Sequence, residues 1–347
     1  MKQVVVADKK FNVAVLGATG LIGEAMIEIL ESSTLPIGKL FLLASEQSSG
    51  EGRTFRGKTV VVKDAAEFDW SQAHIALFSA GFEASGEYAP RATAAGCVVI
   101  DNSSRWRADD AVPLVVPEVN PDALAGWRTK RIVANPNCST IQLVMALKPL
   151  HDAAGLAHVS VASYQAVSGA GRAAVTELAQ QTARLLNAQA LDDPTAFPVQ
   201  IAFNLIPHID TFGDDGFTGE EQKIMRESRK ILGLPQLAIQ ATAVRVPVFF
   251  GHSEVVAVQT EAPLGAERAR ELLALAPGVV VVDARGPAGY PTPVTHAAHA
   301  DGVFVGRLRD DPSRENGLLM WVVADNVRKG GALNAVQIAE ALVKSHL

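Results

Sequence analysis

The hydrophobic pattern of the N-terminal third alternates between short apolar runs and helical repeats. Residues 12–16 form an apolar run that leads directly into a glycine-containing turn at 17–23. Beyond the turn, apolar residues recur at three- and four-residue intervals, as on one face of a helix. Further strand-like runs, separated by helical or loop stretches, occupy residues 40–43, 59–62, 75–78, 98–100 and 114–116. This alternation predicts a doubly wound, mostly parallel sheet.

The pattern changes at residue 138, and the best domain boundary falls just before it. From there the predicted helices cover about 139–154, 173–187, 219–232 and a last segment from near 331, and the strand-like runs cover 159–164, 239–248, 254–260 and parts of 279–311. An irregular stretch rich in Pro, Asp and Gly lies at 188–219. No internal repeat is visible, and no linker separates fully independent domains.

Length and composition narrow the class of protein. A chain of 347 residues suits two domains with cores of their own. The net charge of −6, without a block of Lys and Arg, argues against nucleic-acid binding. No apolar run approaches the roughly 18 residues of a membrane span, and residues 1–10 lack the apolar region of a signal peptide. With only two cysteines, Cys97 and Cys138, we expect a cytoplasmic protein without a disulfide framework.

The turn between the first strand and helix has the context of a dinucleotide-binding loop. Its glycines, Gly17, Gly20 and Gly23, depart in spacing from G-x-G-x-x-G. Glycines let the backbone approach a pyrophosphate, and the helix N-terminus offers N–H donors and positive potential. A merely tight strand–helix turn is the competing interpretation.

The end of the second strand should lie beside the adenosine ribose of such a cofactor. Glu46 could accept a hydrogen bond from a ribose 2′-OH, which favours NAD. No Arg or Lys stands between 44 and 52 to hold a 2′-phosphate, although Arg53 could reach in.

Cys138 is the strongest candidate nucleophile. It follows a strand-like stretch that Asn135 and Pro136 interrupt, and it precedes the helix predicted from about Ser139. A cysteine at a helix N-terminus faces unpaired N–H groups, which favour the thiolate. A thiolate there suits covalent catalysis on a carbonyl, whereas a buried, inert cysteine is the alternative.

Other polar residues interrupt apolar strands or follow them. Arg245, in an apolar strand, needs a partner such as a carboxylate, and His252 could act as a base near neutral pH. A structural ion pair and a structural histidine are the competing interpretations. Gln165 ends a strand beside a glycine loop, and Glu220 and Lys223 share a helix face, unless they are only a solvated pair.

These residues together suggest one reaction class. Arg107 adds another cation near a strand end. One cysteine, one histidine, a dinucleotide loop and several cations suggest oxidation of an aldehyde through a thiohemiacetal and a thioester, which phosphate then attacks.

The chain resembles the aspartate-β-semialdehyde dehydrogenase family over about residues 11–347. The matching motifs are Gly-Ala-Thr-Gly-Leu-Ile-Gly (17–23), Val-Pro-Leu-Val-Val-Pro-Glu-Val-Asn (112–120), Asn-Pro-Asn-Cys-Ser-Thr (135–140), Tyr-Gln-Ala-Val-Ser-Gly-Ala-Gly (164–171), Arg-Val-Pro-Val-Phe-Phe-Gly-His-Ser (245–253) and Ala-Asp-Asn-Val-Arg-Lys-Gly-Gly-Ala-Leu-Asn-Ala-Val-Gln-Ile-Ala-Glu (324–340). It is also similar to the Usg-type paralogue branch, some members of which lack the catalytic cysteine.

The resemblance implies a fold and a domain division. The expected fold is α/β, with a Rossmann-type doubly wound nucleotide-binding domain and an α+β catalytic and dimerisation domain. Because the C-terminal helix of the family returns to the nucleotide domain, we expect residues 1–136 with 326–347 in the first domain and 137–325 in the second. Family members are homodimers.

The resemblance also implies a role for each candidate residue. Cys138 is the nucleophile, His252 the acid/base, and Gln165 orients the substrate. Arg245 binds the substrate α-carboxylate and Glu220 faces its amino group, while Lys223 and Arg107 bind phosphate. The residues expected at the cofactor are Gly17, Thr19, Gly20, Leu21, Ile22, Gly23, Ser45, Gln47, Ser48, Ser168, Gly169 and Asn326, and no metal is expected.

Two departures from the family pattern bear on specificity and catalysis. Gln47 and Glu51 replace the usual Arg and Lys of the adenosine loop, so the cofactor is NAD or NADP with a lean toward NAD or dual use. Ala243 replaces a cysteine upstream of Arg245, away from the nucleophile.

We therefore expect an NAD(P)-dependent, phosphorylating semialdehyde dehydrogenase of amino-acid biosynthesis that interconverts aspartate semialdehyde and aspartyl phosphate. The alternatives are a non-catalytic or altered-specificity dinucleotide-binding paralogue and an N-acetyl-glutamyl-phosphate-type reductase. Glu220 argues against the last, because an acetylated nitrogen carries no positive charge.

Overall fold

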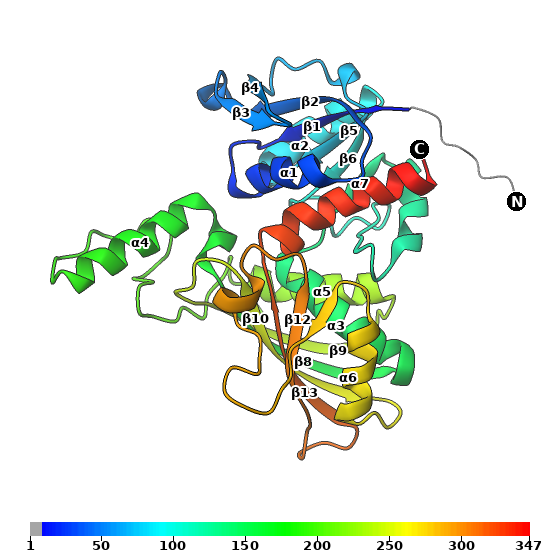
Figure 1. Ribbon diagram of the computed structural model, residues 1–347, viewed down its shortest axis with the longest axis vertical. Coiled ribbons are helices and arrows are strands. Elements are labelled where there is room, and N and C mark those ends of the chain that lie inside the picture. The colour runs from blue at the N-terminus through cyan, green and yellow to red at the C-terminus, as the bar shows by residue number, and fades with distance from the viewer. Residues whose placement is uncertain (1–8) are drawn as a thin grey trace, which may run out of the picture. The chain divides into compact units, whose positions relative to one another are not determined.

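The computed structural model describes residues 9–347, so the segment 1–8 considered for a signal peptide lies outside the described residues. The described chain divides into two compact units (Figure 1). The first unit contains the described residues up to Pro117, Pro121–Asn135 and Ala332–Leu347, and the second contains Glu118–Asn120 and Pro136–Gly331. Within residues 9–347, no helix combines the length and apolar character needed to cross a membrane.

The first unit is built on a seven-stranded sheet, in the order β3-β4-β2-β1-β5-β6-β7. The strands are β1 (Phe11–Leu16), β2 (Ile37–Ala44), β3 (Gly52–Phe55), β4 (Lys58–Asp64), β5 (Ile75–Phe78), β6 (Val98–Asp101) and β7 (Ile132–Ala134). All neighbouring strands run parallel except β3, which pairs antiparallel with β4. The predicted doubly wound sheet is therefore confirmed. The strand predicted at 114–116 is wrong, because Leu114 forms only an isolated bridge with Ala134.

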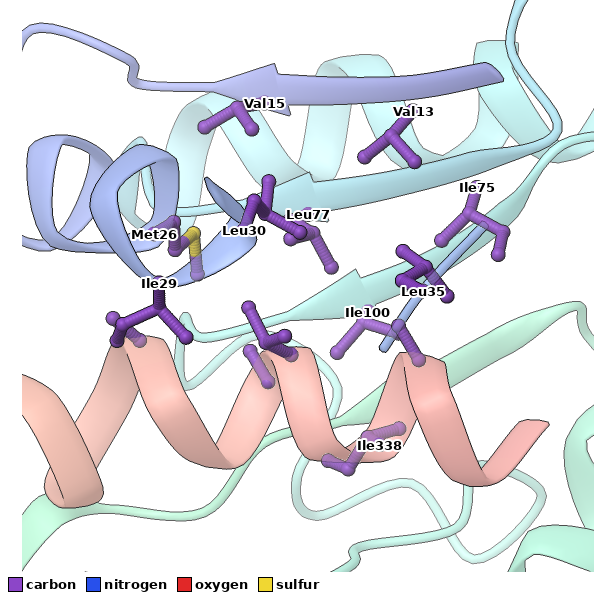
Figure 2. Close-up of a cluster of buried hydrophobic side chains, with 14 of the residues drawn as sticks. Val13, Val15, Met26, Ile29, Leu30, Leu35, Ile75, Leu77, Ile100 and Ile338 are labelled. Atoms are coloured by element: carbon purple, nitrogen blue, oxygen red, sulfur yellow. The ribbon is translucent and has the colours of Figure 1, made fainter. Parts of the chain in front are cut away.

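Three helices accompany this sheet: α1 (Leu21–Ser32), α2 (Gly81–Ala94) and α7 (Leu333–Ser345). Helix α7, the C-terminal one, packs against α1, β5 and β6. Figure 2 shows Ile338 of α7 in the same apolar cluster as Leu77 and Ile100, all of them fully buried. Burial of this face stabilises the unit by roughly 1.5–3 kcal/mol for each large side chain. The last 15 or so residues thus complete the core of the N-terminal sheet.

The second unit contains a six-stranded mixed sheet, in the order β11-β12-β13-β10-β8-β9. Its strands are β8 (Leu156–Gln165), β9 (Ala238–Arg245), β10 (His252–Thr260), β11 (Val279–Val281), β12 (Val303–Asp310) and β13 (Gly317–Ala324), and its helices are α3 (Cys138–Ala154), α4 (Arg172–Leu186), α5 (Gly219–Leu232) and α6 (Ala266–Leu275). Helix α3 packs against β8, β10 and β13, and α5 packs against β9. The sheet and α3 together position the polar residues described next.

Several predicted boundaries move by a few residues. Helix α3 begins at Cys138 itself, β9 ends at Arg245, and β10 begins at His252. The final helix begins at Leu333, after a short π-helix at Arg328–Ala332. The candidate residues Gln165, Arg245 and His252 are therefore the terminal residues of their strands.

Candidate active site

Cys138 is the first residue of α3, and a side chain caps this helix. Asn137, the N-cap residue, accepts hydrogen bonds from the backbone N–H groups of Ser139 (2.9 Å) and Thr140 (3.3 Å). The cap fixes the first turn, so the half-buried Cys138 side chain sits at the positive end of the helix dipole. This placement agrees with thiolate stabilisation, and it differs from that of Cys97, whose burial raises its pKa to about 12.

The other polar candidates converge because strand ends meet at one edge of the sheet. Gln165 and Arg245 end the parallel neighbours β8 and β9, where they are register partners. His252 begins β10, which runs antiparallel to β8, so its first residue lies at the same edge. All three side chains are buried, with 1%, 6% and 0% of their surfaces exposed.

Glu220, in the first turn of α5, connects these strand ends to α3. Its Oε1 accepts hydrogen bonds from the amide groups of Gln165 (3.0 Å) and Asn137 (2.8 Å). A capping box between Thr218 and Glu221 fixes the start of α5 and hence this carboxylate. Glu220 is therefore a buried acceptor held by two elements, rather than a solvated member of a surface pair.

Lys223 lies one turn further along α5 and is partly exposed. Its Nζ is 3.6 Å from Glu220 Oε2 and 2.6 Å from Asp210 Oδ2. Lys223 therefore already has two anionic neighbours, and both belong to the second unit. A phosphate bound there would have to compete with Asp210.

One residue, Ala166, anchors both Arg245 and His252 through its backbone. Its carbonyl accepts from Arg245 Nη1 (2.8 Å), and its N–H donates to His252 Nδ1 (3.0 Å). Burial lowers the pKa of Arg245, while the charges of Glu220 and Cys138 oppose that shift. Arg245 therefore lies within electrostatic reach of the candidate nucleophile.

The same contact fixes the tautomer of His252. Because Nδ1 accepts a hydrogen bond, the proton of the neutral ring is assigned to Nε2. Burial, and secondarily the Arg245 charge, lower the pKa of His252 well below 6.5, so the ring is neutral. Nε2 has no hydrogen-bond partner among residues 9–347. His252 thus presents a buried N–H donor to whatever binds beside it.

Gly169 packs closely against these two side chains. A Cβ at this position would lie 2.8 Å from Arg245 Nη1 and 3.2 Å from His252 Nε2, so any other residue would displace one of them. The neighbouring Ser168 is held by Asn326, whose Nδ2 donates to Ser168 Oγ (2.9 Å) and whose Oδ1 accepts from the Gly251 N–H (2.9 Å). These contacts bring together three segments of the second unit.

In the first unit, the candidate cofactor loop has the backbone that its glycines suggest. Gly17 adopts φ +83°, and a Cβ at Gly23 would lie 2.1 Å from the Gly17 carbonyl oxygen, so neither position tolerates a side chain. Leu21 and Ile22 begin α1, and the N-cap residue Gly20 has no side chain to cap it. The first N–H groups of α1 are therefore available to a pyrophosphate, which fits a dinucleotide.

The adenosine loop follows β2 in the same unit. Ser45 is the N-cap residue of a 3₁₀ turn, Glu46–Ser48, that contains Gln47, and the Oγ atoms of Thr19 and Ser48 lie 3.5 Å apart. The guanidinium of Arg53 lies 2.8 Å from Glu51 Oε2 and 3.5 Å from Glu24 Oε1. Arg53 is thus already engaged by two carboxylates.

Arg107 also belongs to the first unit, where it is buried. Its Nη2 donates to the Asn102 carbonyl (2.6 Å). The structure therefore brings Cys138, Gln165, Glu220, Arg245 and His252 together within the second unit, with Lys223 at the border of this group. Arg107 and the glycine loop are fixed within the first.

Two important contributors were not singled out from the sequence. Asn137 could have been recognised, because an Asn directly before a helical pattern is a standard N-cap. Ala166 acts through its main chain, and no sequence signal identifies such a residue.

Comparison with known proteins gives the family. Residues 12–127 match the semialdehyde dehydrogenase NAD-binding domain, and residues 147–329 match the semialdehyde dehydrogenase dimerisation domain. A protein of Vibrio cholerae named aspartate-semialdehyde dehydrogenase 2 is 54% identical over 338 residues, covering 97% of this chain and 99% of the relative. The chain belongs to the aspartate-semialdehyde dehydrogenase family. A relative from Bacillus subtilis is 46% identical, with 97% and 98% covered.

Solved structures of the family agree. A crystal structure of the Vibrio cholerae aspartate semialdehyde dehydrogenase II, described as complexed with ASA, superposes with a TM-score of 0.96 at 52% identity, covering 98% of this chain and all of that one. The predicted family, fold class and enzyme class are confirmed: the protein is an oxidoreductase of the semialdehyde dehydrogenase type with a domain for a nicotinamide dinucleotide. The dimerisation-domain match supports a homodimer.

Proposed function

We propose that this protein catalyses the reversible, phosphate-dependent oxidation of aspartate semialdehyde to aspartyl phosphate, with Cys138 as the covalent nucleophile. The observation that carries the proposal is the arrangement around Ala166: its backbone fixes Arg245 and His252, the buried Nε2 of His252 has no hydrogen-bond partner among residues 9–347, and Arg245 lies within reach of the charge of Cys138. A guanidinium, an N–H donor and a candidate thiol nucleophile in one group suit a small molecule with an anionic end and a carbonyl.

The reaction balances from the thiolate state. The Cys138 thiolate adds to the aldehyde carbon and forms a C–S bond, which leaves a thiohemiacetal oxyanion. Collapse of the oxyanion releases a hydride, for which a bound nicotinamide dinucleotide would be the acceptor. The resulting thioester is attacked by hydrogen phosphate, so the acyl phosphate leaves, one proton is released and the Cys138 thiolate returns.

His252 is best placed as a hydrogen-bond donor to the oxyanion. The His252 Nδ1 accepts a hydrogen bond from the Ala166 N–H, so protonation of Nδ1 would break this hydrogen bond. Its Nε2–H instead stabilises charge on the substrate oxygen, as oxyanion-hole donors do. Gln165, held by Glu220, is the register partner of Arg245 at the same edge of the sheet.

Arg245 and Glu220 would recognise the two charged ends of the amino acid. Nη1 of Arg245 is occupied by a backbone carbonyl, so Nη2 and Nε form the free edge for the α-carboxylate. Glu220 is a buried carboxylate that a protonated amino group could approach. An N-acetylated substrate would bring no such charge, which disfavours the reductase alternative. Lys223 and Arg107 remain the proposed phosphate ligands.

For the cofactor, we propose NAD or dual use rather than strong NADP preference. Arg53 was the residue that could have rescued 2′-phosphate binding, and its ion pairs with Glu24 and Glu51 support a different role. In this proposal, the Glu46 carboxylate accepts a hydrogen bond from the ribose 2′-OH. Ser45, Gln47 and Ser48 belong to the same turn, and Ser168, Gly169 and Asn326 remain proposed cofactor ligands.

A direct spectrophotometric assay tests the proposal. Purified protein is incubated with aspartate semialdehyde, inorganic phosphate and either NAD or NADP, and reduced cofactor is followed by absorbance. We expect turnover that disappears without phosphate or with Cys138→Ala. Turnover with N-acetyl-glutamyl semialdehyde but not with aspartate semialdehyde would replace the proposed substrate, and binding of cofactor without any turnover would support the non-catalytic paralogue.

A further inference from the structure

Two residues of the sequence motifs quoted above, Glu118 and Lys329, have no role in the reaction described so far. The two residues are 211 positions apart, yet Lys329 Nζ lies 2.8 Å from both carboxylate oxygens of Glu118. The Lys329 side chain is 1% exposed and that of Glu118 is 13% exposed. A fully buried lysine is rare, and this one is paired with a carboxylate.

The residue after Lys329 touches the nucleophile. A Cβ at Gly330 would lie 2.7 Å from the Cβ and 3.2 Å from the Cα of Cys138, so the Gly330 backbone is packed directly on Cys138. Only glycine fits there without displacing the cysteine. Cys138, Gly330, Lys329 and Glu118 all belong to the second unit.

Asp325 fixes the other end of this segment. Its Oδ1 accepts from the N–H groups of Val327 (2.8 Å) and Arg328 (2.9 Å), and its carbonyl accepts from the Gly330 N–H (2.9 Å). The segment 325–330 is thus a closed turn with two anchors, Asp325 through its own hydrogen bonds and Lys329 through Glu118.

We propose that Lys329 and Glu118 are positioning residues: their buried ion pair holds Gly330 against Cys138 and so keeps the thiol at the first turn of α3. Burial lowers the pKa of Lys329, and the Glu118 charge opposes that shift, as expected of a lysine whose charge depends on its partner. The pair would act on Cys138 through Gly330, so its effect is indirect. The activity part of this inference rests on the proposed function, whereas the reactivity of Cys138 does not.

Four variants test the inference. Lys329→Met removes the ion pair and leaves a partly buried carboxylate, and Gly330→Ala pushes directly on Cys138. Glu118→Gln with Lys329→Met removes both charges, which should restore the stability that an unpaired buried charge costs. Arg328→Met is the matched control, because Arg328 is adjacent in the same turn and pairs instead with the exposed Asp301 (2.7 Å).

Two experiments accompany the measurement of thermal stability. Steady-state kinetics give kcat and KM for aspartate semialdehyde. The rate of Cys138 alkylation by iodoacetamide is measured at a fixed pH below 7, and peptide mass distinguishes Cys138 from Cys97. We expect kcat to fall roughly 100-fold in Lys329→Met and Gly330→Ala with KM little changed, as for a displaced nucleophile. Alkylation should slow about tenfold, as for a rise of one unit in the thiol pKa.

The double variant separates positioning from folding. We expect it to regain thermal stability while kcat and alkylation stay low, and we expect Arg328→Met to match the wild type in all three. Full kcat and alkylation in the double variant, or an equal loss in Arg328→Met, would overturn the inference. If the wild type shows no turnover but its alkylation still depends on Lys329, the proposed function fails and the positioning role stands.

Discussion

The active-site group of the second unit and the adenosine loop of the first differ in how far their charges are buried. In the second unit, Glu220, Arg245 and Lys329 are all less than a tenth exposed and are held by named partners, while in the adenosine loop of the first unit Glu46 and Glu51 face water. Electrostatic interactions are strong where water is excluded and are screened at the surface. Substitutions in the buried group should therefore have large effects that depend little on salt, and those in the loop should have small, salt-dependent effects.

The largest effect is expected at the nucleophile of the buried group. Cys138→Ala should abolish aldehyde oxidation, because no thioester can form, while cofactor binding and the circular dichroism spectrum stay unchanged. Cys97→Ala is the matched control, since burial raises the pKa of that thiol to about 12 and leaves it unreactive. Residual phosphate-dependent turnover in Cys138→Ala would rule out the covalent mechanism.

The next effect tests whether buried charge is used for recognition. Arg245→Lys keeps the charge but loses the planar guanidinium. A lysine ammonium cannot donate to the Ala166 carbonyl and also bind a carboxylate through two parallel N–H groups. We expect a loss of about 2–5 kcal/mol in transition-state stabilisation, measured from kcat/KM for aspartate semialdehyde. Kinetics within a factor of three of the wild type would make Arg245 a structural residue.

The sequence predicts local structure in both regions, but it does not predict contacts between residues that are distant in the chain. The glycine loop and its helix follow from local periodicity, and the helix predicted at about 219–232 coincides with α5. The candidate side chains of the active site were also recognisable, but their contacts were not, because they join residues distant in the chain. Asn137 meets Glu220 across 83 positions, and Ala166 acts only through its backbone. A single sequence carries no record of such pairs.

A smaller effect concerns a buried acid beside the site. Glu254 lies two residues after His252 on β10 and is fully buried, and burial raises its pKa well above 4.5 against a weaker opposing contribution from Gln142 of α3. Above pH 4.5 the folded protein retains a proton that the unfolded chain has lost, so the free energy of unfolding should fall as pH rises. The slope is about 1.4 kcal/mol per pH unit for one proton.

Glu254→Gln removes this titration and should flatten the decline above pH 4.5, whereas Glu254→Asp keeps it. His252, whose pKa is lowered, acts in the opposite sense, because the unfolded chain binds a proton below pH 6.5 that the folded protein does not. Its contribution is therefore lost as pH falls, and it is the same in both variants. Urea unfolding at fixed protein concentration measures the slopes. Equal slopes in the wild type and Glu254→Gln would show that Glu254 is ionised in the folded protein.

The smallest effect is expected in the exposed loop. A 2′-phosphate beside Glu46 and Glu51 meets like charges, and Arg53 is engaged by Glu51 and Glu24. Gln47→Arg with Glu51→Lys supplies two cations and frees Arg53 from one partner, so NADP should bind more tightly by about 1 kcal/mol at low salt. Because the loop is exposed, the gain should shrink as the ionic strength rises past about 0.15 M. Titration of both proteins with NAD and NADP at two salt concentrations measures it, with NAD affinity as the internal control. Clearly tighter NADP binding by the wild type would mean that Arg53 leaves its carboxylates for the phosphate, and a gain that persists at high salt would show that the loop is buried when the cofactor is bound.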